Sequence, residues 1–385
     1  MFVTLFFSIF VTITGVGIVV PLLPVYAHDL GASGIYISLI FGSFSISRTV
    51  FVPYFGRLSD KKGRKPFIVF GLFSYAVISV CFMLSHSVET IIGIRFLQGV
   101  ASAMIMPVVQ AYVGDLSRQG KEGLNMGLFN MSTFMGLSIG PMLGGIIKDH
   151  YNVETAFALM GFLSLFGFIM SVSLLPPPVN EVAFQKKRTP MTWNLILKDK
   201  DIMGLFVMRF AYVACIGIIW SFMPILADME FSLSASAIGI LVMVGIFISG
   251  LFQTPMGYLA DRYNKDFMVV SGGIITGVAI LLLKTATGFW GLFAANVLFG
   301  IGGGISMPAV MALAVIEGNR TQAMGTVMSV LTVAHSAGML TGSAMAGVLM
   351  EMNMLKQSFM AGATLMMVSV SLFWLLSIKT RCTRI

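Results

Sequence analysis

The chain has 385 residues, of which only 10% are charged (24 Lys and Arg, 16 Asp and Glu), while apolar residues make up 57%. Soluble domains carry about 25% charged residues, so this composition excludes a soluble enzyme, a nucleic-acid-binding protein and a disordered chain. The net charge of +8 fits the concentration of Lys and Arg in the cytoplasmic loops of membrane proteins. We therefore expect lipid, and no nucleic acid, around the chain.

Twelve apolar segments follow one another along the chain, and a helix that spans a bilayer needs about 20 apolar residues. They predict helices at 3–26, 34–57, 66–85, 89–114, 124–147, 153–175, 202–227, 236–258, 266–284, 288–316, 322–349 and 356–378. The connection at 176–201 is long and carries the basic run Gln185-Lys186-Lys187-Arg188. The predicted fold is an all-α membrane protein with a six-helix bundle at 1–175, a cytoplasmic central loop at 176–201 and a second six-helix bundle at 202–385.

Short sequence patterns recur about 200 residues apart, which indicates an internal repeat. An even number of crossings in each half gives the two halves the same orientation. Parallel six-helix halves with a binding site at their interface are a plan that transporters use. The matched pairs are Gly56–Lys61 with Gly257–Arg262 and Met106-Pro107 with Met307-Pro308 at an offset of 201, and Gly140 and Gly144 with Gly338 and Gly342 at an offset of 198.

The basic residues are distributed unevenly over the connections. If both termini are cytoplasmic, the inside segments hold 18 of the 24 Lys and Arg, and the outside segments hold only Lys148, Lys284 and Lys356. Lys and Arg collect on the cytoplasmic side of membrane proteins. We therefore expect both termini in the cytoplasm and the protein in the inner or plasma membrane.

The turn after the second predicted helix, residues 56–65, fits the pattern G-x-x-x-D-[RK]-x-G-[RK]-[RK] at every fixed position. At this motif the sequence resembles the major facilitator superfamily, and the resemblance covers essentially the whole chain. It implies a cytoplasmic gate in which a carboxylate meets the positive end of a helix dipole. The gate contact is expected to be weaker in the second copy of the motif, because Asn264 stands where a Gly is expected. The implied gate residues are Gly56, Asp60, Gly63, Arg64 and its partner Asp115, with Gly257, Asp261 and Arg262 in the second copy.

Two further motifs extend the resemblance. Arg95-x-x-Gln98-Gly99 resembles a segment that the family associates with proton coupling. The fifth helix carries a series similar to the G-x-x-x-G-P-x-x-G-G motif of the drug/proton antiporter subfamilies. Its glycines form a groove for a facing helix, and its proline interrupts one backbone hydrogen bond. The residues of this series are Gly136, Gly140, Pro141, Gly144 and Gly145.

Ionisable and amide side chains inside predicted helices are expected to be functional, because burying them in lipid costs several kcal/mol. Most lie in helices that the family places around its central cavity. The candidates for substrate binding or coupling are Tyr26, Arg48, Arg95, Gln98, Asn130, Arg209, Asn296 and His335.

All sixteen acidic residues map to loops or helix ends, so the buried carboxylate of many cation exporters is missing. Two explanations remain open. Coupling uses Asp29, Asp115 or the imidazole of His335, a group that titrates near pH 6.5. Alternatively, the substrate is neutral or anionic and meets Arg48, Arg95 or Arg209.

The predicted function is secondary active transport, with proton-coupled efflux of small amphiphilic compounds by alternating access. The alternatives are a carrier of an organic anion or neutral metabolite, and a lipid flippase. An intramembrane enzyme is disfavoured because the chain has no H-E-x-x-H, no G-x-S-x-G and no paired carboxylates. We expect a monomer with a small-molecule substrate, no metal and no cofactor other than the proton gradient.

Overall fold

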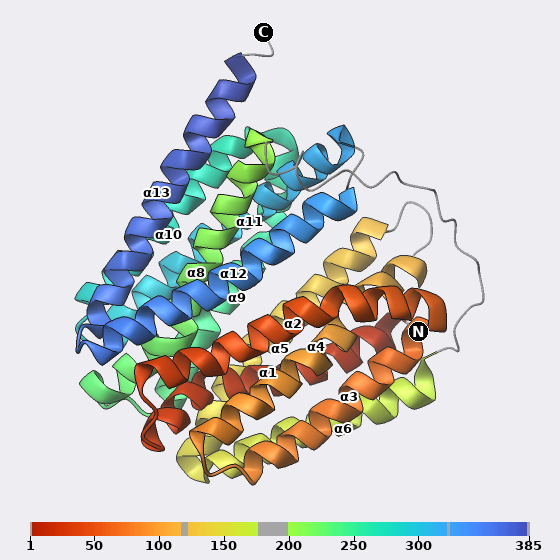
Figure 1. Ribbon diagram of the computed structural model, residues 1–385, viewed down its shortest axis with the longest axis vertical. Helices are drawn as coiled ribbons and strands as arrows, with labels where there is room; N and C mark the ends of the chain where they lie inside the picture. Colours follow the sequence, from red (N-terminus) through yellow and green to blue (C-terminus); the bar gives the residue numbers. More distant parts are fainter. Residues whose placement is uncertain (1, 117–121, 176–198, 322–323, 383–385) are drawn as a thin grey trace. The chain divides into compact units, whose positions relative to one another are not determined.

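The computed structural model describes residues 2–116, 122–175, 199–321 and 324–382, and Figure 1 shows that this part of the chain is helical throughout. Its twelve helices match the twelve predicted segments to within a few residues. In chain order they are α1 Phe2–Asp29, α2 Gly34–Lys62, α3 Arg64–Met83, α4 Val88–Leu116, α5 Glu122–His150, α6 Val153–Leu174, α8 Lys200–Phe231, α9 Ala235–Arg262, α10 Lys265–Thr285, α11 Phe289–Arg320, α12 Met324–Glu351 and α13 Leu355–Cys382.

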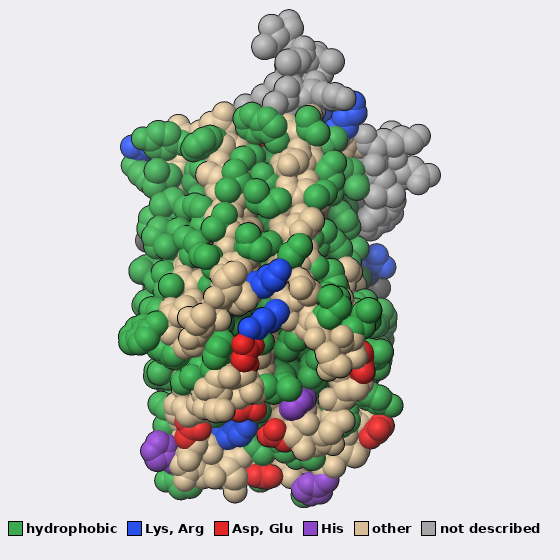
Figure 2. Space-filling view, turned by 90° about the vertical axis from the view of Figure 1, so that its left-hand side faces the viewer, with side chains coloured by type: hydrophobic (Ala, Val, Ile, Leu, Met, Phe, Trp, Pro, Cys, Tyr) green, Lys and Arg blue, Asp and Glu red, His purple; other side chains and the backbone are tan. Residues whose placement is uncertain are grey.

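Eleven of these helices are long and apolar enough over their described residues to cross a membrane, and α5 lies outside this set. Large apolar side chains such as Phe162 and Leu251 are 64% and 59% exposed. Hydrophobic side chains cover most of the face seen in Figure 2, with few charged side chains among them. In water this surface would be costly, whereas in a bilayer it is the ordinary lipid-facing surface of a helical membrane protein. The all-α membrane fold is confirmed.

The helices pair within each half in the same way. In the first half α1 lies against α5 and α6, α2 against α4, and α3 against α4 and α6; in the second half α10 lies against α11 and α13. Prolines recur inside equivalent helices, and each interrupts the helix at the same place in both copies. The recurring pairs are Pro24 and Pro224, Pro53 and Pro255, and Pro107 and Pro308.

Glycines let α5 lie directly on the backbone of α1, as predicted. A Cβ placed on Gly136 would be 2.7 Å from the Phe10 carbonyl oxygen, and one on Gly140 would collide with the Thr14 carbonyl oxygen and the backbone of Gly17. Without side chains at these positions the two helices approach closely enough for their backbones to touch. In the first repeat, close packing of α1 on α5 therefore depends on glycine.

The second repeat uses the same packing, and it corrects the predicted register by one helical turn. Gly338 faces the Phe210 carbonyl and Gly342 faces the Ala214 carbonyl. These contacts pair Gly338 with Gly136 and Gly342 with Gly140, an offset of 202 and not the predicted 198. Because the glycines recur every four residues, a shift of four gives an equally good sequence match. Under the corrected register, Ser343 stands where Pro141 stands in the first repeat.

By its internal contacts the chain forms two compact units. The first contains α1 to α6 together with Trp220–Ile246, the adjoining ends of α8 and α9. The second contains the rest of α8 and α9 and all of α10 to α13. Residues 220–246 join the first unit because α9 contacts the end of α5, where a Cβ on Gly145 would meet the Ala235 carbonyl. The predicted central loop lies outside the described residues except for 199–201.

Candidate functional site

Arg95 and Gln98 lie together in the interior of the first unit. Arg95 is 8% exposed and Gln98 is fully buried. The Arg95 guanidinium donates Nη1–H to Gln98 Oε1 at 2.7 Å and Nε–H to the Ile40 carbonyl oxygen at 3.3 Å. Its Cζ lies 5.3 Å from the ring centre of Phe41 and 4.6 Å from that of Phe44. Arg95 is therefore fixed between α2 and α4, where its charge is compensated by a carbonyl, an amide and two aromatic rings.

Two features of this site were not predicted. Tyr75 of α3 is 3% exposed and lies within electrostatic range of both Arg48 and Arg95. Gln98 Nε2 is buried, and no described group accepts its hydrogen bond. The only signal for Tyr75 in the sequence is a hydroxyl in an apolar helix, which is too common to single it out.

The other polar candidates are engaged in local structure. The Tyr26 hydroxyl donates to the Ser85 carbonyl oxygen at 2.9 Å, and its ring meets Phe157 edge to face. Asn296 is 2% exposed and donates to the Leu292 carbonyl oxygen of its own helix at 2.9 Å. Asn130 is exposed on α5.

The second unit brings together Arg209 of α8, Met307 of α11 and His335 of α12. Arg209 Nη2 lies 3.2 Å from His335 Nδ1, and Arg209 Nη1 donates to Met307 Sδ at 3.3 Å. Both contacts are part-buried. The sequence singled out Arg209 and His335 separately, but nothing in it showed that they meet.

The glycine packing described above produces this contact. Gly338 seats α12 on α8 at the carbonyl of Phe210. His335 lies three residues before Gly338, and Arg209 directly precedes Phe210. The imidazole and the guanidinium consequently face each other across the closely packed pair of helices.

The gate motif is partly described. Gly63 ends α2 with φ 87°, a conformation that favours glycine, and Arg64 Nη1 donates to Ser59 Oγ at 2.7 Å. Asn264 stands in place of Gly63 in the second copy. Its side chain caps α10 by accepting a hydrogen bond from the backbone N–H of Asp266. The structure does not describe the side chains of three predicted gate residues. The contact between Arg64 and Asp115 and the capping of a helix end by Asp60 therefore stay predictions. These three residues are Asp60, Asp115 and Asp261.

Neither Gly56 nor Gly257, the two predicted gate glycines, is closely packed by a described residue. No described atom lies within 4 Å of a Cβ placed on Gly56 or on Gly257. Within the described part of the first unit, no helix packs closely on Gly56. Arg262 places its Cζ 4.3 Å from the ring centre of Tyr258 on the same helix.

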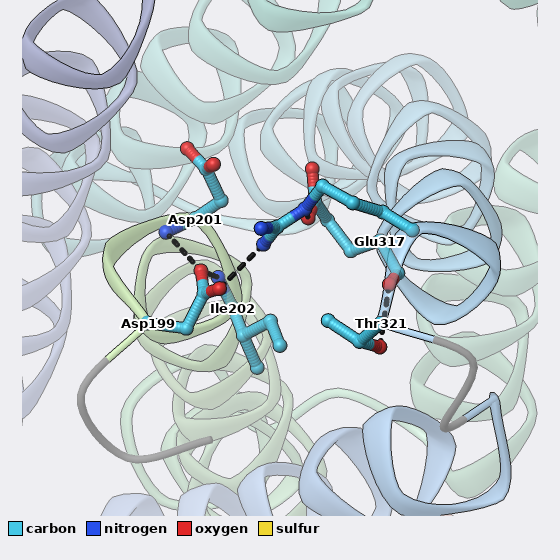
Figure 3. Close-up of polar contacts among 6 residues, drawn as sticks. Asp199, Asp201, Ile202, Glu317 and Thr321 are labelled. Atoms are coloured by element: carbon cyan, nitrogen blue, oxygen red, sulfur yellow. Dashed lines mark hydrogen bonds and ion pairs between the residues drawn. The ribbon is translucent and has the colours of Figure 1, made fainter. Parts of the chain in front are cut away.

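An acidic cluster closes one end of the second unit and was not predicted. Figure 3 shows Asp199, directly before α8, close to Asp201 of α8 and Glu317 of α11, and Arg320 forms ion pairs with Asp199 and Glu317. The cluster borders a cavity of about 410 Å³ that Lys265 also lines. The Arg320 guanidinium pairs with two of the carboxylates and so joins the start of α8 to the end of α11.

Asp149 at the end of α5 caps the N-terminus of α9. Its Oδ1 accepts from the Ala235 N–H at 2.9 Å and its Oδ2 from the Ser236 N–H at 2.8 Å. Desolvation raises the pKa of Asp149, but hydrogen bonds from Ser236, Ala235 and Ser234 outweigh it, and the pKa lies below its usual value. The ionised carboxylate thus stabilises this helix end.

Replacing Asp149 with Ala is expected to lower the free energy of unfolding by about 0.5–1 kcal/mol, because this exposed cap is screened by solvent. A group with a lowered pKa stabilises the fold above its unfolded pKa, near 3.9, and loses that contribution as the pH falls below it. The difference in thermal midpoint between wild type and Asp149→Ala should stay constant from pH 6 to 8 and shrink below about pH 4. Glu89→Ala, at an exposed first-turn position of α4, is the control. A difference that varies between pH 6 and 8 contradicts the cap.

The observed architecture is that of a membrane transporter: long apolar helices in two repeats, with polar side chains held between the helices of each unit. The Major Facilitator Superfamily matches residues 5–234 and 205–381. The chain therefore belongs to the major facilitator superfamily, and it is a transporter and not an enzyme.

Similar proteins cover nearly the whole chain. It is 30% identical over 350 residues to an uncharacterized MFS-type transporter of Methanocaldococcus jannaschii, with 89% of each chain covered. It is 28% identical over 368 residues to the quinolone resistance protein NorA of Staphylococcus aureus, with 93% of this chain and 92% of NorA covered. The solved structure of the nucleoside transporter NupG superposes with a TM-score of 0.79 at 13% identity, covering 97% of this chain and 98% of that one. That likeness shows a common fold.

Proposed function

We propose that the protein is a secondary active transporter of the plasma membrane, monomeric and with both termini in the cytoplasm, that exports small amphiphilic compounds by alternating access with proton entry as its energy source. The observation that carries this proposal is the glycine and proline series of α5, which lies on α1 at Gly136 and Gly140 and on α9 at Gly145. The motif resembles that of drug/proton antiporters. Similarity to a quinolone resistance protein along 93% of the chain also supports export as the direction of transport.

A second candidate function is carriage of an organic anion. It is favoured by the contact between Arg209 and His335 in the second unit and by the position of every acidic residue at a helix end or in a loop. A basic pair inside the membrane attracts negative charge and repels a cation.

Flux into proteoliposomes separates the two candidates by the sign of the pH gradient. An antiporter should accumulate quaternary ammonium compounds when the interior is acidic, because protons leave as the substrate enters. A proton-linked anion carrier should accumulate aryl sulfonates when the interior is alkaline. Permanently charged probes exclude passive partition of weak acids and bases, and protein-free liposomes give the background. Flux of neither class under either gradient, in protein that is folded and inserted, would contradict proton-coupled transport of charged amphiphiles.

A further inference from the structure

The contact between Arg209 and His335 is a hydrogen bond in only one state of the imidazole. A guanidinium has only donors, so the atom that meets Arg209 Nη2 at 3.2 Å accepts if the hydrogen bond forms. In that state His335 Nδ1 carries a lone pair, and the proton of the neutral ring is on Nε2. In this geometry the site holds one positive charge, that of Arg209.

Protonating His335 at Nδ1 would turn this acceptor into a donor that faces another donor. Two positive charges at about 3 Å repel each other strongly in a low-dielectric environment. An anion that lies against both groups would stabilise the protonated pair. An oxyanion can accept from the guanidinium and the imidazolium together, and charge-assisted hydrogen bonds of this kind are stronger than neutral ones.

An oxyanion could also replace Met307, the second hydrogen-bond acceptor of Arg209. Arg209 Nη1 donates to the thioether sulfur of Met307 at 3.3 Å, and a thioether is a weak acceptor. A carboxylate offers two oxygens at the spacing of two guanidinium N–H groups. Moving Arg209 from Met307 to a ligand would thus exchange a weak hydrogen bond for a strong one.

The neighbouring charges leave room for this anion. Arg209 lies eight residues from Asp201 along α8, about 12 Å of helix, and His335 lies sixteen residues from Glu351 along α12, about 24 Å. The helices that pack against α12 are α8, α11 and α13. Their charged or titratable side chains in the described part of the second unit are Lys200, Asp201, Arg209, Tyr212 and Cys215 on α8, Glu317 and Arg320 at the end of α11, and Lys356 at the start of α13. The nearest cation along these helices is Arg209 itself.

The pair belongs to the second repeat alone. Under the register that the packing defines, Arg209 corresponds to Ile9 and His335 to Thr133 in the first repeat. Ile9 is fully buried, and the Thr133 hydroxyl donates to the Phe129 carbonyl oxygen of its own helix. The equivalent packed helices therefore form a complete structure without a basic pair, so the pair is an addition to the repeat and is not required by the fold.

We infer that Arg209 and His335 form an anion-binding site that takes up the carboxylate of the substrate together with one proton. The proton goes to His335 Nδ1 and the carboxylate binds against both cations, so the site gains no net charge. Each ligand strengthens the binding of the other. The inference rests on the second candidate function and names its substrate class as organic monocarboxylates.

Equilibrium binding to the purified full-length chain in detergent tests this site without any flux. The probes are benzoate, phenylacetate and 1-naphthoate, each beside its amide, titrated by calorimetry at pH 6 and pH 8. We expect saturable binding of at least one carboxylate, more than tenfold tighter at pH 6 than at pH 8, and at least tenfold tighter than that of the matching amide.

Three variants locate the effect. His335→Gln keeps an acceptor for Arg209 but cannot be protonated, so carboxylate binding should weaken and lose its pH dependence. His335→Lys supplies a permanent charge, so binding should be retained at pH 8. Arg209→Gln should abolish binding, while Lys284→Gln and His150→Gln, at helix ends, should match the wild type. A monodisperse elution profile confirms that each variant is folded.

Each result decides the inference. It is overturned if no carboxylate binds the wild type at pH 6, if Arg209→Gln binds as the wild type does, or if His335→Gln keeps the pH dependence. Absent flux together with pH-dependent carboxylate binding would contradict the transport proposal and leave the site standing. Flux that does not depend on Arg209 would contradict the site alone.

Discussion

Gly140→Leu should prevent α5 from seating on α1 and leave little folded protein. Even a Cβ at this position would collide with the Thr14 carbonyl oxygen and the backbone of Gly17. A leucine adds three further carbons between two backbones, and overpacking of this kind costs on the order of 3 kcal/mol or more. We expect loss of the monodisperse peak in detergent and a large fall in the yield of protein in the membrane.

The matched control is Gly93→Leu. Gly93 lies within α4, and no atom lies within 4 Å of a Cβ placed there. The same substitution should leave the elution profile and thermal midpoint near those of the wild type. Equal yields and midpoints for Gly140→Leu and the wild type would show that the close packing of α1 on α5 is wrong.

Gln98→Leu should destabilise the first unit by about 2–4 kcal/mol, because it removes an acceptor from a charge that is already buried. Arg95 would keep the Ile40 carbonyl at 3.3 Å but lose the 2.7 Å bond to Gln98 Oε1. The expected result is a thermal midpoint several degrees below that of the wild type, measured in detergent.

A double-mutant cycle separates the pair from the substitution itself. Arg95→Met combined with Gln98→Leu removes both polar groups at similar volume, so much of the lost stability should return. Gln110→Leu, at an exposed position of the same helix, is the control and should have little effect. If the double variant is no more stable than Gln98→Leu alone, the two side chains are not coupled as described.

The helices and the repeat were accessible from the sequence because their signals are long-range averages. Each apolar segment contributes about 20 residues of the same character, so the twelve helices were predicted to within a few residues. The internal repeat followed from the near-constant offset of the matched motifs. Its register on α12 was wrong by four residues because the glycines recur at that interval, and only the contacts of Gly338 and Gly342 resolve it.

The candidate sites were harder to predict, because they depend on which helices pack together. Arg209 and His335 were each recognised as polar groups in apolar helices, but their contact spans 126 residues of sequence. It follows only from the corrected register, which seats α12 on α8 beside Phe210. Arg95 and Gln98 lie three residues apart on one helix, and for that reason their pairing could be anticipated from the motif.

The acidic contacts were missed for a different reason. Asp149, Asp199 and Glu317 lie at helix ends, where charged residues are common and carry no specific signal. Asp149 caps a helix 86 residues further along the chain, and Arg320 reaches Asp199 across a segment of 121 residues. Local sequence patterns contain no information on such distances.

The central claim is that substrate binding and proton binding are linked at Arg209 and His335, and proton exchange on ligand binding measures this link directly. The purified protein is mixed with a carboxylate probe in weakly buffered detergent at pH 7.5, and a pH indicator follows the solution. We expect uptake of close to one proton per bound ligand, and no such uptake in His335→Gln. Proton release on binding, or uptake of the same size in His335→Gln, would contradict it.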